Sequence, residues 1–148
     1  MAALVTLIGM GRIWAPGAPG DAIVLTSAEL AGVWRDEQGG SLVLAGDGTF
    51  SASSACGDYI DPESKAGSGF GLTPVKTGTG TWDLESGSPI EGGPAQSTVR
   101  IEFGPGGVGT EYEATGTIAA PTLWTYIGDP DSGERCILKK ETTEETTR

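Results

Sequence analysis

Residues 41–55 read SLVLAGDGTFSASSA, and this stretch decides the fold class. Two leucines alternate with smaller residues in its first half, and Phe50 and Ala52 alternate with polar residues in its second half. Alternation with a period of two places such side chains on one face of a β-strand. Asp47-Gly48 lies between the halves and is a strong hairpin signal, because glycine adopts the positive φ of a tight turn. The stretch therefore predicts a β-hairpin with one apolar face.

The same pattern recurs along the chain on both sides of this hairpin. No helical period of useful length separates the repeats, which argues against a parallel βαβ order. Residues 26–29 (TSAE) fit a capping box and predict one short helical turn. We therefore predict an all-β fold with little helix, an antiparallel up-and-down β-barrel of about eight strands. Besides the hairpin, the predicted strands cover residues 30–35, 76–85, 99–103, 111–118, 123–127 and 135–140.

The composition limits the chemistry. The chain has 148 residues, enough for one domain of ordinary size. Its 20 acidic and 9 basic residues give a net charge of −11, which argues against nucleic-acid binding, because phosphate contacts depend on Lys and Arg. It contains no histidine, which excludes mechanisms that depend on an imidazole, such as Ser–His–Asp hydrolysis. We predict no catalytic residues, no metal ligands and no cofactor.

The two ends differ from the middle. Residues 1–14 are apolar apart from Thr6 and Arg12, and a Pro/Gly-rich linker follows. The run is too short to span a bilayer, and it lacks the positive start of a secretory signal. We interpret residues 1–22 as the remnant of a signal or membrane anchor, with a disordered tail as the alternative. Residues 23–140 form the predicted barrel domain, and residues 141–148 a polar C-terminal tail.

Several short motifs resemble known families. Leu30-Ala-Gly-Val-Trp34, Gly40-Ser-Leu and Asp47-Gly-Thr-Phe50 resemble the opening hairpin of calycin-type barrels, the lipocalins and avidins. With Gly-x-Gly-Thr-Trp at 78–82 and Ile-Gly-Asp-Pro-Asp-Ser-Gly-Glu-Arg at 127–135, the chain from about Leu25 to Lys140 resembles small exported proteins and lipoproteins of actinobacteria with no assigned function. The resemblance implies a calycin-like barrel and an exported protein.

In calycins the tryptophan of the first strand plugs one end of the barrel, and a basic side chain of the closing strand stacks over it. An indole face attracts a guanidinium or ammonium group. The resemblance implies that Trp34 is this plug and that Gly32 lets the backbone pass close by. Arg135, Lys139 and Lys140 are the available cations, and the sequence does not choose among them. We therefore predict that the plug consists of Gly32, Trp34 and one of these cations, with Arg135 named as its representative.

Cys56 and Cys136 are the only cysteines. Their separation excludes a C-x-x-C redox or zinc motif. In an exported chain, two cysteines indicate one disulfide. We therefore predict a Cys56–Cys136 disulfide, with two buried thiols of a cytosolic protein as the alternative.

The longest predicted irregular segment covers residues 56–76. It places Tyr59, Ile60 and Phe70 among acidic residues, and aromatic side chains often anchor interfaces. We consider these three residues a possible partner-binding tip, with an ordinary surface loop as the alternative. The acidic stretch 128–134 (GDPDSGE) does not match an EF-hand loop, and a hairpin turn explains it.

These observations lead to a ranked set of functions. We expect a non-catalytic exported or cell-envelope barrel that acts as a binding or interaction module. A lipocalin-like carrier of a small apolar ligand is the alternative, and an enzyme or enzyme inhibitor ranks last. The partner would be an unknown protein or a small apolar ligand, and contact with a membrane would run only through the N-terminal segment. We expect side chains to fill the barrel: Trp34, Leu42, Leu44, Phe50, Trp82, Leu84, Ile101, Phe103, Tyr112 and Leu138.

Overall fold

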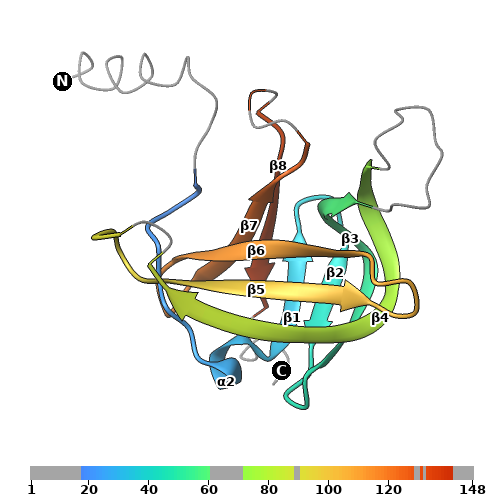
Figure 1. The fold of residues 1–148 in the computed structure, drawn as a ribbon, viewed down its shortest axis with the longest axis horizontal. Helices are drawn as coiled ribbons and strands as arrows, with labels where there is room; N and C mark the ends of the chain where they lie inside the picture. The colour runs from blue at the N-terminus through green and yellow to red at the C-terminus, as the bar shows by residue number, and fades with distance from the viewer. Residues whose placement is uncertain (1–17, 61–71, 89–90, 129–130, 132, 142–148) are drawn as a thin grey trace, which may run out of the picture.

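The computed structural model describes residues 18–60, 72–88, 91–128, 131 and 133–141. It shows a closed antiparallel barrel in which each strand pairs with the next along the chain and β8 pairs back with β1 (Figure 1). The predicted fold class is confirmed. The elements are α2 (Ser27–Leu30), β1 (Gly32–Asp36), β2 (Ser41–Leu44), β3 (Thr49–Ile60), β4 (Leu72–Gly87), β5 (Gln96–Phe103), β6 (Gly109–Gly116), β7 (Pro121–Tyr126) and β8 (Arg135–Lys140).

The predicted hairpin joins β2 and β3. Gly48 adopts a φ of 93°, and its amide donates to the carbonyl of Ala45 at 3.1 Å. The hydroxyl and amide of Thr49 both donate to Asp47 Oδ1, at 2.6 and 3.0 Å. These hydrogen bonds favour the charged carboxylate and lower the pKa of Asp47 below its ordinary value. Local chemistry therefore fixes this turn.

The short helix α2 has the predicted capping box. The hydroxyl of Thr26 accepts from the amide of Glu29 at 3.1 Å, and the Glu29 carboxylate accepts from the amide of Thr26 at 2.8 Å. The first strand begins at Gly32, two residues later than predicted, because Leu30 still belongs to α2. None of the described helices is long and apolar enough to cross a membrane.

The chain before α2 is attached to the barrel. The amide of Gly116 donates to the carbonyl of Asp21 at 2.8 Å, and the amide of Ser97 donates to the carbonyl of Ile23 at 3.0 Å. This segment therefore lies between the start of β5 and the end of β6. Residues 1–17 and 142–148, which hold most of the two predicted terminal segments, lie outside the described residues.

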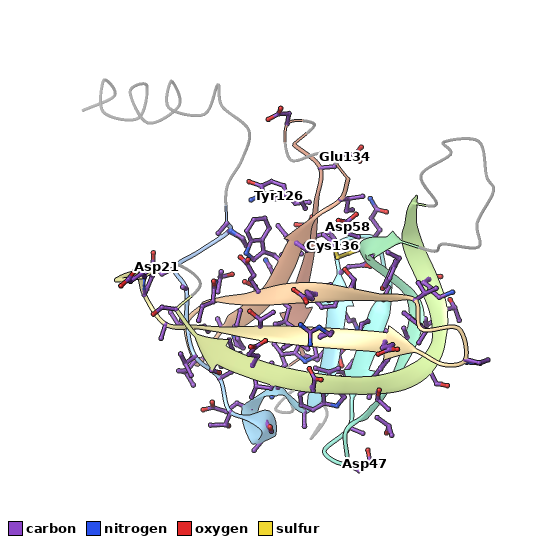
Figure 2. The ribbon with its side chains drawn as sticks, viewed as in Figure 1. Asp21, Asp47, Asp58, Tyr126, Glu134 and Cys136 are labelled. Carbon is purple, nitrogen blue, oxygen red and sulfur yellow. A yellow bond between two sulfur atoms is a disulfide. The ribbon has the colours of Figure 1, made fainter. Side chains whose placement is uncertain are left out.

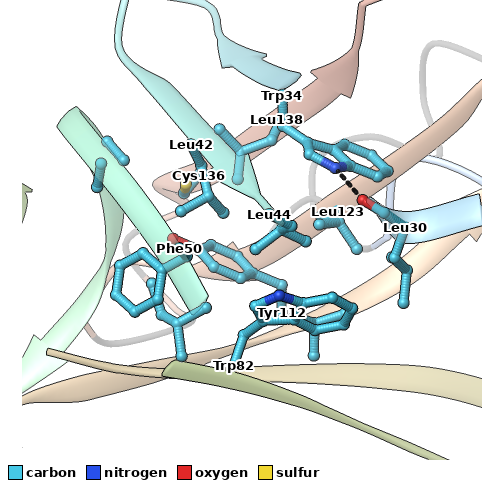
Figure 3. Packing of buried hydrophobic residues seen from close by; sticks show 14 of the residues in the cluster. Leu30, Trp34, Leu42, Leu44, Phe50, Trp82, Tyr112, Leu123, Cys136 and Leu138 are labelled. Carbon is cyan, nitrogen blue, oxygen red and sulfur yellow. Dashed lines mark hydrogen bonds between the residues drawn. The ribbon is translucent and has the colours of Figure 1, made fainter. Parts of the chain in front are cut away.

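Large side chains occupy the middle of the barrel (Figure 3). Phe50 and Phe103 meet edge to face with ring centres 4.9 Å apart, and Tyr59 meets Phe103 in the same way at 5.5 Å. Nine of the ten residues predicted to fill the barrel are in the core, and the tenth, Leu84, packs against it. Aromatic rings thus fill the interior of the barrel.

Strand β3 is longer than predicted. The predicted strands ended at residue 55 and resumed at residue 76, whereas β3 runs to Ile60 and β4 begins at Leu72. The register between them shifts twice, between Ala52 and Ala55 and again between Cys56 and Tyr59, and Ser54 adopts a φ of 52°. Such β-bulges bend a strand. The two bulges therefore interrupt the period-two alternation, so the sequence pattern did not predict that the strand continues to Ile60.

Candidate functional site

Trp34 is buried beside α2. It is completely buried, and its Nε1 donates to the carbonyl of Leu30 at 2.9 Å. Lys140 is its ladder partner on β8, and the Lys140 ammonium donates to the carbonyl of Glu29 at 2.5 Å. A Cβ on Gly32, whose φ is 142°, would lie 2.8 Å from Lys140 Cε. Trp34, Gly32 and Lys140 thus form one group under α2.

Arg135 does not belong to this group. It begins β8 at the opposite end of the barrel, where its ladder partner is Tyr126. The expectation for Arg135 is therefore corrected, because the β1–β8 register brings Lys140 beside Trp34. The sequence alone did not choose among Arg135, Lys139 and Lys140, because it does not specify the β1–β8 register.

The second half of β3, residues 55–60, crosses the other end of the barrel, and we call it the mouth arm. Cys56 forms a disulfide with Cys136 of β8, with Cα atoms 5.6 Å apart, which confirms the predicted disulfide. The amide of Asp58 donates to Thr110 Oγ1 of β6 at 3.1 Å, and Asp58 Oδ1 accepts from the amide of Gly128 at 3.1 Å. Figure 2 shows Asp58 and Cys136 together at this end. The mouth arm is therefore tied to both β6 and β8.

Burial alternates along the mouth arm. Ala55, Gly57 and Tyr59 are buried, whereas Cys56 and Asp58 are partly exposed. A Cβ on Gly57 would lie 2.8 Å from the Tyr59 ring, so glycine makes room for this ring. The inner side of the arm thus seals the barrel, while Cys56 and Asp58 on its other side stay partly exposed.

Tyr59 and Tyr112 meet beneath the arm. Tyr112 donates to the carbonyl of Cys56 at 2.7 Å, Tyr59 donates to the carbonyl of Ala55 at 3.0 Å, and the two hydroxyl oxygens lie 3.2 Å apart. Both residues are completely buried. Tyr59 is therefore a core residue and no part of a partner-binding tip, which corrects that expectation. Ile60 ends β3, and Phe70 lies outside the described residues.

This tyrosine pair predicts how stability depends on pH. Burial disfavours the phenolate and raises the pKa of Tyr59 to about 12, and it raises the pKa of Tyr112 well above 10. The folded chain therefore holds these protons more tightly than the unfolded chain. Its stability is fully present below pH ~10 and is lost as the pH rises through ~12, by at least ~2 kcal/mol.

Urea unfolding at a series of pH values measures this loss. With no histidine and both cysteines in the disulfide, no side chain has an ordinary pKa between about 5 and 9. We therefore expect a nearly constant free energy of unfolding from pH ~6 to ~9. A titration step within that range would contradict the assignment, and so would undiminished stability at pH ~12. Tyr59→Phe should weaken the alkaline loss.

Asp36 holds the first turn against the mouth arm. Its Oδ1 accepts from the amides of Gln38 and Gly40, at 2.9 and 2.7 Å, and its Oδ2 accepts from the amide of Cys56 at 3.1 Å. A Cβ on Gly40 would overlap the backbone of Ser54, so the turn and β3 approach closely. One carboxylate thus fixes the position of Cys56.

A cleft opens outside the barrel beside the disulfide, and we call it the rim cleft. Its volume is about 400 Å³, within the range of small-ligand sites. Three carboxylates, one guanidinium and three aliphatic side chains line it, and Val75 among these is 44% exposed. The lining consists of Asp36, Glu37, Gln38, Cys56, Val75, Ile127, Glu134, Arg135 and Ile137.

The outer face of β4–β6 is strongly acidic. Arg100 binds Glu111 through a salt bridge of 2.8 Å, while Asp83 and Glu85 are exposed beside them. An exposed pair of this kind contributes little to stability. Within the described part of the chain, no three side chains form a group that could hold a metal ion.

Sequence reasoning missed one cation at the mouth. Lys76 of β4 lies over the ring of Phe103, with the ammonium 5.1 Å from the ring centre. Lys76 is the first residue of the predicted strand 76–85 and lies an even number of positions from Trp82, so the period-two pattern of that strand already placed its side chain on the inner face.

Comparisons with protein-family models, with curated proteins and with solved structures found no match. The closed eight-stranded antiparallel barrel is consistent with a calycin-like fold through its geometry.

Proposed function

We propose that this protein is a non-catalytic barrel of the cell exterior or cell envelope that binds a partner on its outer surface. One observation carries the proposal: both ends of the barrel are covered and its middle is filled. Trp34 and α2 cover one end, the mouth arm covers the other, and aromatic rings lie between them. The rim cleft is the candidate contact area. The lack of histidine also supports a non-catalytic role.

The disulfide supports the exterior location. Disulfides persist in oxidising compartments and are rare in reduced cytosol. The resemblance to small exported actinobacterial proteins points the same way, with residues 1–22 as the signal or anchor. The net charge of −11 would keep such a protein soluble and disfavour its self-association.

A lipocalin-like carrier ranks second. Such a carrier needs a continuous apolar cavity, and barrels of this strand number are either filled by side chains or hold one small ligand. Here Phe50, Phe103 and Tyr112 lie in the middle of the barrel and are almost completely buried. A bound lipid would have to displace these rings.

The test uses the protein isolated from its natural host without reductant. We expect an intact mass equal to that of the processed chain less two hydrogen atoms, with no lipid adduct under native conditions. We also expect no fluorescence increase when the neutral apolar probe N-phenyl-1-naphthylamine is added. A co-purified lipid or a saturable increase in probe fluorescence would favour the carrier. Two free thiols in the native protein would contradict the exterior location.

A further inference from the structure

Cys56 and Cys136 differ in their access to solvent. Cys136 is 1% exposed, whereas Cys56 is partly exposed and lines the rim cleft. The amide of Cys56 donates to Asp36, and its carbonyl accepts from Tyr112, so the polar atoms of its backbone are engaged. The Cys56 side chain packs partly against the core and also borders the rim cleft, whereas Cys136 belongs to the core itself.

From this asymmetry we propose that Cys56 is a modification site, at which a small thiol entering the rim cleft forms a mixed disulfide. The inference does not depend on the proposed function, because it concerns only the disulfide and its surroundings.

The exchange is a displacement at sulfur. The incoming thiolate attacks Cys56 Sγ and forms a new S–S bond while the Cys56–Cys136 bond breaks, and the electron pair leaves on Cys136 Sγ, which takes up a proton. A second thiolate can then attack the external sulfur of the mixed disulfide. This releases Cys56 as a thiol and the reagent as its own disulfide. The external thiol is thus the only reductant required.

The charges around the cleft select among thiols. Asp36, Glu37 and Glu134 contribute three carboxylates to the lining, against the single guanidinium of Arg135. The whole chain also has a net charge of −11. A thiol that carries an ammonium group should therefore enter more readily than one that carries an anion, and salt should reduce the difference.

Modification would loosen the mouth arm. Without the disulfide, the side-chain ties that remain on the mouth arm among the described residues are the Asp36 contact to Cys56, the Asp58 contacts to Thr110 and Gly128, and the two tyrosine hydroxyls. Tyr59 and Tyr112 lie directly beneath the arm, so their solvent exposure reports its position.

Peptide mapping tests the site of attack on the native chain. The protein is treated with cysteamine, quenched in acid, alkylated with N-ethylmaleimide and digested. We expect cysteamine on Cys56 and the alkyl group on Cys136. The reverse distribution, or equal amounts on both cysteines, would overturn the proposal.

Two controls separate attack on the native state from attack after unfolding. The exchange rate should stay within about twofold in low urea and in Trp34→Phe, which removes a buried hydrogen bond outside the cleft lining and raises the unfolded fraction at least ~10-fold. A rate that rises in proportion to the unfolded fraction would overturn the proposal. If Trp34→Phe does not fold, the urea series alone decides.

Matched reagents test the charge of the cleft. Cysteamine and 2-mercaptoethanesulfonate share one carbon skeleton and carry opposite charges, and their rates are compared per thiolate. We expect cysteamine to react at least ~5-fold faster at low ionic strength, and the ratio to approach one in 1 M salt, where the screening length is only ~3 Å. A ratio near one at low salt, or a faster anionic thiol, would contradict the rim cleft as the route of entry.

Discussion

Replacing both cysteines by alanine should lower the free energy of unfolding by about 3–4 kcal/mol. The disulfide joins residues 80 positions apart, and the chain-entropy model assigns a loop of this length about 4.5 kcal/mol, from which native strain and residual structure in the unfolded chain subtract. Alanine is the better replacement for the fully buried Cys136, because serine would also bury a hydroxyl. Urea unfolding of the oxidised parent and the double variant measures the difference.

The reduced parent is the matched control, since it loses the same cross-link without any change of sequence. Both forms should lose similar stability and show similar slopes with urea. A loss below about 1 kcal/mol in both would mean that the disulfide adds little to a mouth arm already fixed by its hydrogen bonds. The pH profile of the double variant should keep its alkaline fall, because the two tyrosines remain in the core.

Gly80→Ala should also destabilise the barrel strongly, by about 3 kcal/mol or more. A Cβ at this position would overlap the backbone carbonyl of Glu102 on β5 and would lie 2.8 Å from Phe50 Cε1. Backbone atoms in a paired ladder cannot move aside singly, and a closely packed interior transmits the strain. Thermal or urea unfolding gives the loss directly.

Gly87→Ala on the same strand is its control. A Cβ there would meet nothing within 4 Å, and its φ lies outside the left-handed region. We expect a change of less than about 1 kcal/mol, toward higher stability, because alanine restricts the unfolded chain. Equal losses at positions 80 and 87 would show that strand propensity, and not the contact with Glu102, determines the effect.

The sequence was sufficient wherever the deciding chemistry is local. Asp47-Gly48 specifies its turn through neighbouring residues, and Thr26 and Glu29 cap α2 in the same way. The period-two pattern located the core for a related reason, since one buried face is enough to show it. Such features need no knowledge of which strands are neighbours.

The sequence was insufficient wherever the deciding contact joins distant segments. Lys140 rather than Arg135 lies beside Trp34 because of the β1–β8 register, which no local pattern encodes. Residues 53–58 carry mostly small and polar side chains, so nothing in the sequence showed that the strand continues through two bulges. Tyr59 therefore looked like a loop residue, although its ring belongs to the core.

The pairing of β8 with β1 has a further consequence. An open sheet presents a row of unused amide and carbonyl groups on which another chain can polymerise by strand addition. Here the hydrogen-bonded ring returns to its own beginning through Trp34, Arg35 and Asp36. The folded protein should therefore tolerate high concentrations without forming fibrils, as long as this short seam of three residue pairs stays closed.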